Sequence, residues 1–526
     1  MKKFIVIGIL IVSLSCYTTN GLTNAYNKDS TSYAIINVDD EGDGDFTSIQ
    51  TAISEASPGD TIRVYSGTYN ENIEVDKENL TIEGINYELG TGDDNGYPSI
   101  IGDGNDDVVK ITSDNISFSG FIIQNSGKSY YDAGIEIHSN NSEVFRNGLT
   151  GNFYGVVINY CHKNVVRENY IAGNTMDGIY MMYTSDNIIS NNQITENGFQ
   201  GVFLYDADDN EIKDNILSLN GKDGIHLRNL CAYNTISDNT IYSNNIDGIK
   251  LWEPGNNYNT IIGNEIYSNR FNGIHIMNSN NNEIYENEIK LNLLNGIHIG
   301  DASDNIIQRN TIRDSFSEGI MILGGDSNNN LIYYNNIIND TALDNGNNIW
   351  DSGYPSGGNY WSYYSGTDND NDGIGDIPYD IPGSGGNQDR YPFIKPLQPP
   401  NKPTKPKGPT LGKPGVEYIY QTSAVDPNGN KIQYGWDWNG DKKVDFWSDF
   451  YNSGVTANAS HSWDQQGDYQ IYVIAMDQQG FKSEWSEPLT VTMPKTYANL
   501  LDLLYHHINL YYVLEKLMLD ILMRMY

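Results

Sequence analysis

The chain has 526 residues, and its 68 Asp and Glu outnumber its 31 Lys and Arg to give a formal net charge of −37. This excess of acid excludes nucleic acid as a partner, because phosphate backbones are bound by basic surfaces.

The N-terminal residues have the composition of a secretory signal. Lys2 and Lys3 precede an apolar run from Phe4 to Leu14, and small residues follow, so we assign residues 1–25 to a signal peptide. The protein is therefore expected outside the cytoplasm, either secreted or on the cell surface. Cys16 leaves lipid attachment open, and an uncleaved membrane anchor is a further alternative.

Residues 35–60 are predicted to form a cap made of a strand and a helix. The apolar residues Phe46, Ile49, Ala52, Ile53 and Ala56 follow helical spacing. Asp45 or Thr47 is available as the N-cap, and the helix ends before Pro58-Gly59. We expect this helix to close the N-terminal end of the following domain and to block edge-to-edge growth.

Between residues 61 and 345, a glycine followed by a branched apolar residue recurs about every 23 residues. The glycines are Gly155, Gly178, Gly201, Gly224, Gly248, Gly273, Gly296 and Gly319. Asparagine and isoleucine recur between them in the pattern N-x-I-x-x-N-x-I, as in Asn259 to Ile266. Such short segments of period two, rich in glycine and asparagine, are not helices. The repeat predicts an all-β chain whose coils form a parallel β-helix (solenoid).

Residues one period apart are expected to lie above one another, because adjacent coils stack at about 4.8 Å. An apolar column inside the coils is predicted from Ile216, Ile241, Ile266, Ile289 and Ile312. A hydrogen-bonded column at a turn is predicted from Asn215, Asn239, Asn264, Asn287 and Asn310. Cys161 and Cys231 would lie about three coils, or roughly 14 Å, apart, which is too far for a disulfide. We therefore expect two unpaired thiols.

The side chain two residues after each glycine is expected to point outward, because its neighbours point inward. This outward column is Tyr180, Phe203, His226, Lys250, His275, His298 and Met321, and the parallel column four after glycine is Met182, Tyr205, Arg228, Trp252 and Met277. Rings and polar groups in such a strip suit sugars. We predict glycan binding by Tyr180, Phe203, Tyr205, His226, Arg228, Trp252 and His275. The alternative is that the ladders only stabilise the sheet.

Residues 346–397 are predicted to cap the other end of the β-helix, and they contain an Asp-rich loop. Asp368, Asp370, Asp372 and Asp376 occupy positions 1, 3, 5 and 9, with glycine at position 6, which is the spacing of a calcium loop. Position 12 is Tyr379 rather than Glu, and an acidic solvated turn is the alternative. A second, weaker candidate is formed by Asp437, Asn439, Asp441 and Asp445.

Three further segments follow the cap. Residues 398–413 have the proline and lysine content of a linker. Residues 414–493 are expected to form a small Ig-like β-sandwich with strands at 418–422, 432–438, 459–463, 469–476 and 489–493. Residues 496–526 carry an apolar stripe at helical spacing interrupted by charges, which predicts a terminal amphipathic helix that docks on a membrane surface or a protein partner.

The coils resemble the right-handed parallel β-helix repeats of the NosD family and of the wider carbohydrate-binding and sugar-hydrolase superfamily. Gly358-Asn359-Tyr360-Trp361, the segment from Asp370 to Tyr379, and Arg390-Tyr391-Pro392 resemble the closing signature of that family. The later segment resembles a PKD-type domain through Trp436-Asp437-Trp438 and Gly467-Asp468-Tyr469. Both resemblances imply an extracytoplasmic protein and, for the first, a right-handed solenoid.

Three functions are compatible with these observations. We favour a non-catalytic surface protein that binds glycans or envelope polymers or has a structural, adhesive role. A polysaccharide hydrolase or lyase is the first alternative, and Asp206, Asp208, Glu253 and His226 would be its catalytic residues. No Gly-His-Gly or Asp-Pro-His element of known β-helix enzymes is present.

The second alternative is maturation of a copper enzyme, which the NosD resemblance implies. His275 and His298 would be one coil apart and able to share a soft metal ion. Lys250 separates them from His226, and no cysteine or methionine cluster joins them, so the sequence argues against copper. Calcium remains the cofactor that we expect.

Overall fold

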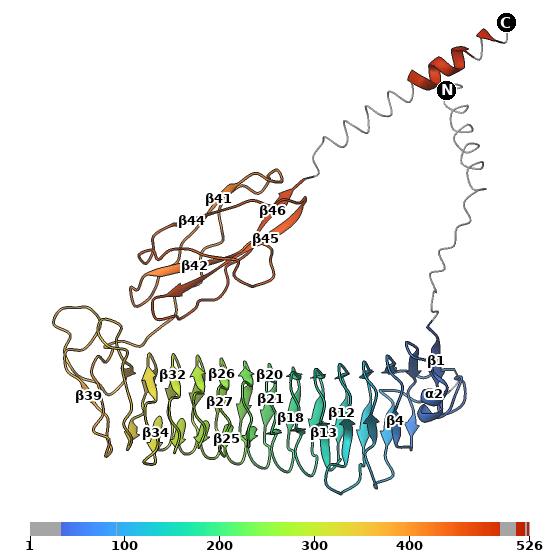
Figure 1. The fold of residues 1–526 in the computed structure, drawn as a ribbon, viewed down its shortest axis with the longest axis horizontal. Coiled ribbons are helices and arrows are strands. Elements are labelled where there is room, and N and C mark those ends of the chain that lie inside the picture. Colours follow the sequence, from blue (N-terminus) through green and yellow to red (C-terminus); the bar gives the residue numbers. More distant parts are fainter. Residues whose placement is uncertain (1–32, 91, 495–511, 521–522, 525–526) are drawn as a thin grey trace.

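The computed structural model describes residues 33–90, 92–494, 512–520 and 523–524. Most of the chain forms a parallel β-helix of three long sheets, which we call sheets A, B and C, and a smaller β domain follows it (Figure 1). The predicted solenoid and the β-sandwich after it are thereby confirmed. The signal peptide predicted at residues 1–25 lies outside the described residues.

Each coil contributes one strand to each sheet, in the order A, B, C. Sheet A has 13 strands: β1 (Ile35–Val38), β2 (Thr61–Val64), β5 (Thr81–Gly84), β8 (Ser117–Ser119), β11 (Glu143–Phe145), β14 (Val165–Arg167), β17 (Ile188–Ser190), β20 (Glu211–Lys213), β23 (Thr235–Ser237), β26 (Thr260–Ile262), β29 (Glu283–Tyr285), β32 (Ile306–Gln308) and β35 (Leu331–Tyr333).

Sheet B also has 13 strands: β3 (Thr68–Tyr69), β6 (Ser99–Ile101), β9 (Ile122–Gln124), β12 (Gly148–Thr150), β15 (Tyr170–Ala172), β18 (Gln193–Thr195), β21 (Ile216–Ser218), β24 (Thr240–Tyr242), β27 (Glu265–Tyr267), β30 (Glu288–Lys290), β33 (Thr311–Arg313), β36 (Asn336–Ile338) and β38 (Tyr360–Trp361).

Sheet C has 12 strands: β4 (Ile73–Val75), β7 (Val109–Ile111), β10 (Ala133–Ile137), β13 (Tyr154–Asn159), β16 (Ile179–Met182), β19 (Val202–Tyr205), β22 (Ile225–Arg228), β25 (Ile249–Trp252), β28 (Ile274–Met277), β31 (Ile297–Gly300), β34 (Ile320–Leu323) and β37 (Ala342–Asp344). Sheet C holds the residues that follow the repeated glycines.

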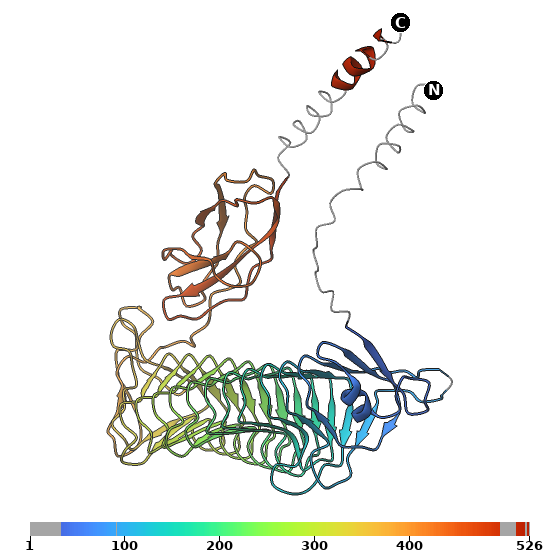
Figure 2. The same ribbon diagram turned by 45° about the vertical axis from the view of Figure 1, so that its right-hand side comes forward.

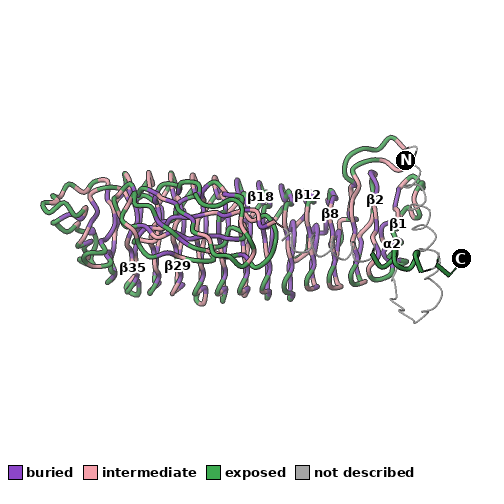
Figure 3. The backbone as a smooth tube through the Cα atoms, turned by 90° about the horizontal axis from the view of Figure 1, so that it is seen from above, coloured by how far each residue is buried: buried purple, intermediate pink, exposed green. Residues whose placement is uncertain are grey.

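The apolar column inside sheet B is confirmed except at its first member. Leu217, not Ile216, lies in register with Ile241, and the column continues through Ile266, Ile289 and Ile312. Ile216 is 42 % exposed, so its prediction as a core residue was wrong. Neighbouring residues of a strand point to opposite faces, and in this coil the inward position is the second after the turn asparagine. Figure 3 shows the buried positions recurring along the solenoid.

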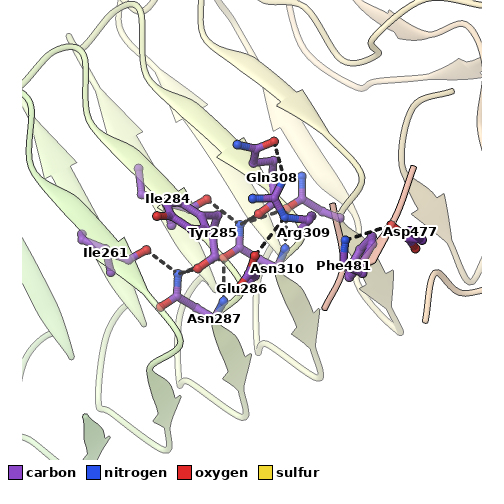
Figure 4. Close-up of polar contacts among 11 residues, drawn as sticks. Ile261, Ile284, Tyr285, Glu286, Asn287, Gln308, Arg309, Asn310, Asp477 and Phe481 are labelled. Carbon is purple, nitrogen blue, oxygen red and sulfur yellow. Dashed lines mark hydrogen bonds and ion pairs between the residues drawn. The ribbon is translucent and has the colours of Figure 1, made fainter. Parts of the chain in front are cut away.

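The predicted asparagine column is confirmed and joins consecutive coils by side-chain hydrogen bonds. The amide Nδ2 of Asn264 donates to Oδ1 of Asn287 at 2.9 Å, and Asn287 donates in turn to Asn310 at 2.9 Å. Each amide also donates to a backbone carbonyl, as Asn287 does to Ile261 and Asn310 does to Ile284 (Figure 4). These buried amides are thus fully used within the stack.

The repeated glycines are required by close packing between coils. A Cβ at Gly248 would lie 2.5 Å from Cγ2 of Ile266 and 2.6 Å from the carbonyl oxygen of Gly273. A side chain at this position would therefore collide with the next coil.

The N-terminal end is closed by α2 (Ile49–Glu55), whose Ile49, Ala52 and Ile53 are buried in the core of the β-helix (Figure 1). The N-cap is Ser48, whose hydroxyl accepts a hydrogen bond from Thr51 N at 3.2 Å, so both predicted N-caps, Asp45 and Thr47, were wrong. Glu71 fixes Ser48 from a different coil by accepting a bond from its hydroxyl at 2.9 Å.

At the other end, the segment predicted as a cap completes the last coil. Asn359 extends the asparagine column, accepting from Asn335 at 2.9 Å, and Trp361 is buried on Asp389. Beyond it lie the short strands β39 (Tyr379–Asp380) and β40 (Gln388–Asp389), which pair antiparallel.

The C-terminal domain contains a two-stranded and a four-stranded sheet. Its strands are β41 (Tyr418–Thr422), β42 (Ile432–Asp437), β43 (Phe446–Trp447), β44 (Ala457–His461), β45 (Gly467–Asp477) and β46 (Leu489–Met493). The sequence did not predict β43. The segment 398–413 is bonded to this domain, because Lys407 and Gln421 exchange two backbone hydrogen bonds and Gly412 N donates to Thr492.

The two domains touch through an apolar contact. Phe481 of the small domain is buried in a cluster with Tyr334, Phe393 and Leu397 at the end of the β-helix. Figure 4 shows Phe481 and Asp477 facing the turn that carries Arg309.

The predicted C-terminal helix is described in part. Residues 512–520 are helical, with Leu514, Leu517 and Met518 exposed, and residues 497–511 lie outside the described part of the chain. Within the described residues, no helix combines the length and apolar character needed to cross a membrane.

The thiols of Cys161 and Cys231 are buried and unpaired, as predicted. Burial raises the pKa of Cys161 to about 11 and that of Cys231 to about 12, so neither is a thiolate at neutral pH.

Candidate functional site on the outer face of sheet C

The predicted outward column lies on the outer face of sheet C in unbroken register. Tyr180 pairs with Phe203, and the column continues through His226, Lys250, His275, His298 and Met321. The second column is in register through Met182, Tyr205, Arg228 and Trp252. The two columns form one strip along the axis of the solenoid.

The N-terminal half of this strip is a packed aromatic cluster. The ring centroids of Tyr154 and Tyr180 are 5.5 Å apart, and those of Tyr180 and Phe203 are 5.3 Å apart. Tyr131 stacks on Tyr180 at 5.9 Å from a preceding turn. Tyr180 is consequently only 3 % exposed, so it offers a ligand little ring surface and contributes to the strip mainly by packing.

The middle of the strip is more accessible and carries both rings and cations. Phe203, Tyr205 and Trp252 are half-buried, and Arg228 is exposed. Lys250 Nζ lies 4.5 Å from the centre of the Trp252 ring, and Arg228 Nη2 binds Glu253 at 2.7 Å. A flat ring with a forked donor beside it is a surface on which a sugar can stack and form hydrogen bonds.

A row of polar residues that the sequence analysis missed runs along the edge of the strip. These residues directly precede the repeated glycines and are buried: Asp177, Gln200, Asp223, Asp247, Asn272 and Asn295. The recurring Asp-Gly pairs at 177, 223 and 247 are the sequence signal that marks them. Two members of this row, Asp223 and Asp247, contact histidines of the outward column.

These acids hold the histidines of the strip. His226 Nδ1 lies 3.1 Å from Asp223 Oδ2, and His275 Nδ1 lies 2.9 Å from Asp247 Oδ2. Lys250 Nζ approaches Asp247 Oδ2 at 3.6 Å. Nε2 of His226 and Nε2 of His275 are buried and have no hydrogen-bond partner within the described residues. His226 is only 8 % exposed, so it offers a ligand little ring surface.

Burial and charge shift the pKa values of this site in different directions. Burial opposes ionisation of Asp247, but the hydrogen bond from His275 and the charge of Lys250 keep its pKa below the ordinary value. Asp177 has no such cation in contact, and burial raises its pKa to about 7. Burial and the neighbouring His275 lower the pKa of His298 to about 4, so His298 is neutral.

Three of the residues named for an enzyme are engaged in other contacts. Asp208 lies in the turn after sheet C, where its Oδ1 accepts a hydrogen bond from Ala232 N at 2.7 Å. The carboxylate of Glu253 is bound by Arg228, which lowers its pKa. Asp206 occupies the same turn as Asp208, with a φ of 50°. His226 is paired with Asp223 instead.

The Asp-rich loop brings three of its four predicted ligands together. One carboxylate oxygen from each of Asp368, Asp370 and Asp372 lies within 4.8 Å of the others. Asp376 is turned to Asn369, accepting from its backbone N at 2.8 Å and from its Nδ2 at 2.7 Å.

In the second candidate loop the acids serve the backbone turn. Asp437 accepts bonds from the N–H groups of Asn439, Gly440 and Lys442, and Asp445 accepts one from Trp438. Both acids thus shape the turn by accepting backbone hydrogen bonds, as Asp368 and Asp372 do in the first loop.

The geometry of His275 and His298 does not fit a shared copper ion. Their rings are stacked, with centroids 4.7 Å apart and planes inclined by 15°. A metal binds an imidazole nitrogen in the ring plane at about 2 Å, and one ion cannot lie in two nearly parallel, separated planes. Nδ1 of His275 is also occupied by Asp247.

Comparison with known proteins links the β-helix to one family. Residues 56–272 and 231–366 match the profile of the family described as periplasmic copper-binding protein (NosD). No curated protein sequence matches the chain.

Among solved structures, the PKD domain of an M14-like peptidase from Thermoplasmatales archaeon SCGC AB-540-F20 is 40 % identical over 19 % of this chain and 99 % of that chain, with a TM-score of 0.17. The A-module of the Azotobacter vinelandii mannuronan C-5 epimerase AlgE6 is 16 % identical over 57 % of this chain and 90 % of that chain, with a TM-score of 0.48. DFA-IIIase from Arthrobacter chlorophenolicus A6 without its lid is 12 % identical over 52 % of this chain and 84 % of that chain, with a TM-score of 0.40.

Proposed function

The chain belongs to the NosD family, which is described as periplasmic copper-binding protein. We propose that it is an extracytoplasmic, non-catalytic β-helix protein that binds glycans on the outer face of sheet C. The observation that carries this proposal is the half-exposed strip of Phe203, Tyr205, Arg228 and Trp252 on a rigid stack of coils. The polymer would be part of the cell envelope or its surroundings.

The strip is preorganised for a chain-like ligand. Consecutive coils place equivalent side chains about 4.8 Å apart, and the strands that carry them are fixed on both sides by backbone pairing. Binding therefore orders little of the protein, which limits the entropic cost. The contacts are shallow, so we expect dissociation constants between micromolar and millimolar.

Catalysis is less well supported than binding. Glycoside hydrolysis needs two carboxyl groups that flank the scissile bond. Glu253 is neutralised by Arg228, and Asp208 is committed to a backbone hydrogen bond in a turn. A polysaccharide hydrolase or lyase therefore remains the alternative function. Detection of a cleaved or unsaturated polysaccharide product would establish it.

A copper function is not supported by the donor atoms of the described residues. Copper favours imidazole and thiolate ligands that converge on one point. The groups of three or more side chains that gather potential ligand atoms contain only carboxylates, and the two buried thiols keep their protons. The function proposed here therefore does not involve copper.

Two accessory features belong to the proposal. Asp368, Asp370 and Asp372 would bind calcium beside the last coil, where carboxylate oxygens are the ligands that this ion prefers. The terminal helix would dock on a membrane surface or a protein partner through its exposed apolar side chains.

The proposed glycan site is tested by screening the full chain on a glycan array and titrating the best ligand calorimetrically. Trp252→Ala should weaken binding about tenfold or more, equivalent to about 1.4 kcal/mol. Tyr267→Ala is the matched control, because Tyr267 is a half-buried ring stacked on Tyr242 at 5.0 Å on sheet B. Equal binding by the wild type and Trp252→Ala would exclude this site.

A further inference from the structure

The N-terminal end of the β-helix contains a group of acids that the sequence analysis did not single out. Asp39, Asp40 and Glu41 directly follow β1, and Glu88 and Asp94 lie in the connection between β5 and β6. One oxygen each from Asp39, Glu41 and Glu88 lie within 4.8 Å of one another, and the same holds for Asp40, Glu41 and Asp94. Glu41 belongs to both groups.

The two segments that carry these acids are folded against each other. Tyr87 packs edge-on against Tyr65 with ring centroids 5.7 Å apart, and its carbonyl accepts a hydrogen bond from Ser66 N at 3.2 Å. Gly90 has a φ of +87°, and a Cβ there would lie 2.0 Å from Asp43 Oδ2. Backbone packing thus holds the acids together. The cap and this connection form the end of the solenoid next to β1 (Figure 2).

Several of these carboxylate oxygens are buried without a partner. Asp39 is 0 % exposed; its Oδ2 accepts a bond from Asp43 N at 2.9 Å, but its Oδ1 has no hydrogen-bond partner. Oδ1 of Asp40 and both oxygens of Glu88 are likewise buried and unpartnered. None of the ion pairs among the described residues involves these five acids. Such groups are costly unless a cation compensates them.

We propose that Asp39, Glu41 and Glu88, supported by Asp40 and Asp94, bind a calcium ion that fastens the N-terminal cap to the connection between β5 and β6. The ligand set consists only of oxygen atoms, which suits a hard cation. Calcium accepts six to eight oxygen ligands in flexible geometry, whereas magnesium demands near-ideal octahedral geometry and usually keeps several waters, so a crowded set of carboxylates from two segments suits calcium.

The ion would act at the N-terminal edge of sheet A. β1 is the edge strand of sheet A, and an uncovered edge can pair with another chain. The carboxylates of Asp39, Glu41 and Glu88 lie close to one another. A bound calcium ion would replace their mutual repulsion with attraction and would hold the two segments together.

The experiment is a calcium titration of the full chain after dialysis against a chelator, read by calorimetry and by the melting temperature. Glu41→Gln/Glu88→Gln should lose one class of calcium sites or raise its dissociation constant at least about tenfold. Asp370→Ala/Asp372→Ala should retain that class, which separates it from the Asp-rich loop. Glu78→Gln is the control for the loss of an exposed acid in the connection that precedes β5.

The sign of the change without calcium gives a second readout. The double Gln variant removes like charges, so it should melt no lower than the wild type in chelator, but it should lose the calcium-induced increase. Glu41 is exposed, and Glu41→Gln alone provides the same test if the double variant does not fold. Unchanged calcium stoichiometry and affinity in these variants, or an equal effect of magnesium, would overturn the proposal.

Discussion

Asp247 shows how a single side chain joins two consecutive coils. Its Oδ1 accepts bonds from the backbone N of Asn272 at 2.9 Å and from the side chain of Asn272 at 2.8 Å, while its Oδ2 binds His275 at 2.9 Å. Asp177 occupies the equivalent place before Gly178, but its Oδ1 accepts only from Gln200 N at 2.8 Å. The anionic form of Asp247 is therefore stabilised by its neighbours, whereas burial disfavours the anionic form of Asp177.

We predict that Asp177 makes the stability of the protein depend on pH. Its folded pKa is about 7, above the unfolded value of about 4, so the folded state binds the proton more tightly between these pH values. Stability is then greatest below about pH 4 for this group and is lost as the pH rises towards 7, by up to about 4 kcal/mol.

Asp177→Asn keeps an acceptor for Gln200 but cannot ionise. Urea unfolding at pH 5 and pH 7.5 should show a smaller difference for the variant than for the wild type, with the variant more stable at the higher pH. Because other buried acids titrate in both proteins, the comparison between them is the measurement. Identical pH dependence of the two would show that Asp177 is ionised in the folded state.

At this scale, the sequence predicted residue types better than single positions. The asparagine and isoleucine columns followed from the period, since every coil repeats the same pattern. Ile216 was misplaced because two apolar residues, Ile216 and Leu217, follow Asn215, and only the register decides which one points inward. The acid row before the glycines was missed because its members vary among Asp, Gln and Asn.

Elements whose ends depend on tertiary contacts were harder to predict. Ser48 became the N-cap of α2 because Glu71, from another coil, fixes its hydroxyl. The segment 398–413 has the composition of a free linker, yet its backbone bonds to β41 and the strand end at Thr492. Composition reports local preference, whereas these contacts join residues far apart in the sequence.

The Asp-rich loop is the element whose behaviour should change most with calcium. Wild-type protein should melt several degrees higher in millimolar calcium than in chelator, because an ion that binds only the folded state stabilises it by mass action. Asp370→Ala/Asp372→Ala should lose the part of this increase that belongs to the loop. If the variant and the wild type respond alike to calcium by calorimetry, the loop is only a turn.

On the scale of the whole molecule, the small domain is joined to the C-terminal end of the β-helix. Phe481 anchors the small domain at the last coils, beside Tyr334 and Phe393. The helical residues 512–520 are exposed along their length. An exposed apolar helix in an extracytoplasmic protein is a liability unless it is covered.

We predict that a chain ending at residue 496 loses its attachment to the cell envelope. The truncated protein should move from the envelope fraction to the soluble fraction and should remain folded, since the sandwich core is complete at β46. Fractionation followed by immunoblotting measures the distribution. An unchanged distribution and unchanged solubility would leave the helix without the role proposed for it.

The most direct test of the central claim is the dependence of affinity on glycan length. The strip from Phe203 to His298 spans five coils in register, or roughly 19 Å, so affinity for oligosaccharides of the polymer identified on the array should rise with length and then level off. We expect Trp252→Ala to flatten this increase, and every oligosaccharide to be recovered intact. Length-independent affinity, no effect of Trp252→Ala, or shortened products would contradict the account of sheet C as a non-catalytic glycan-binding face.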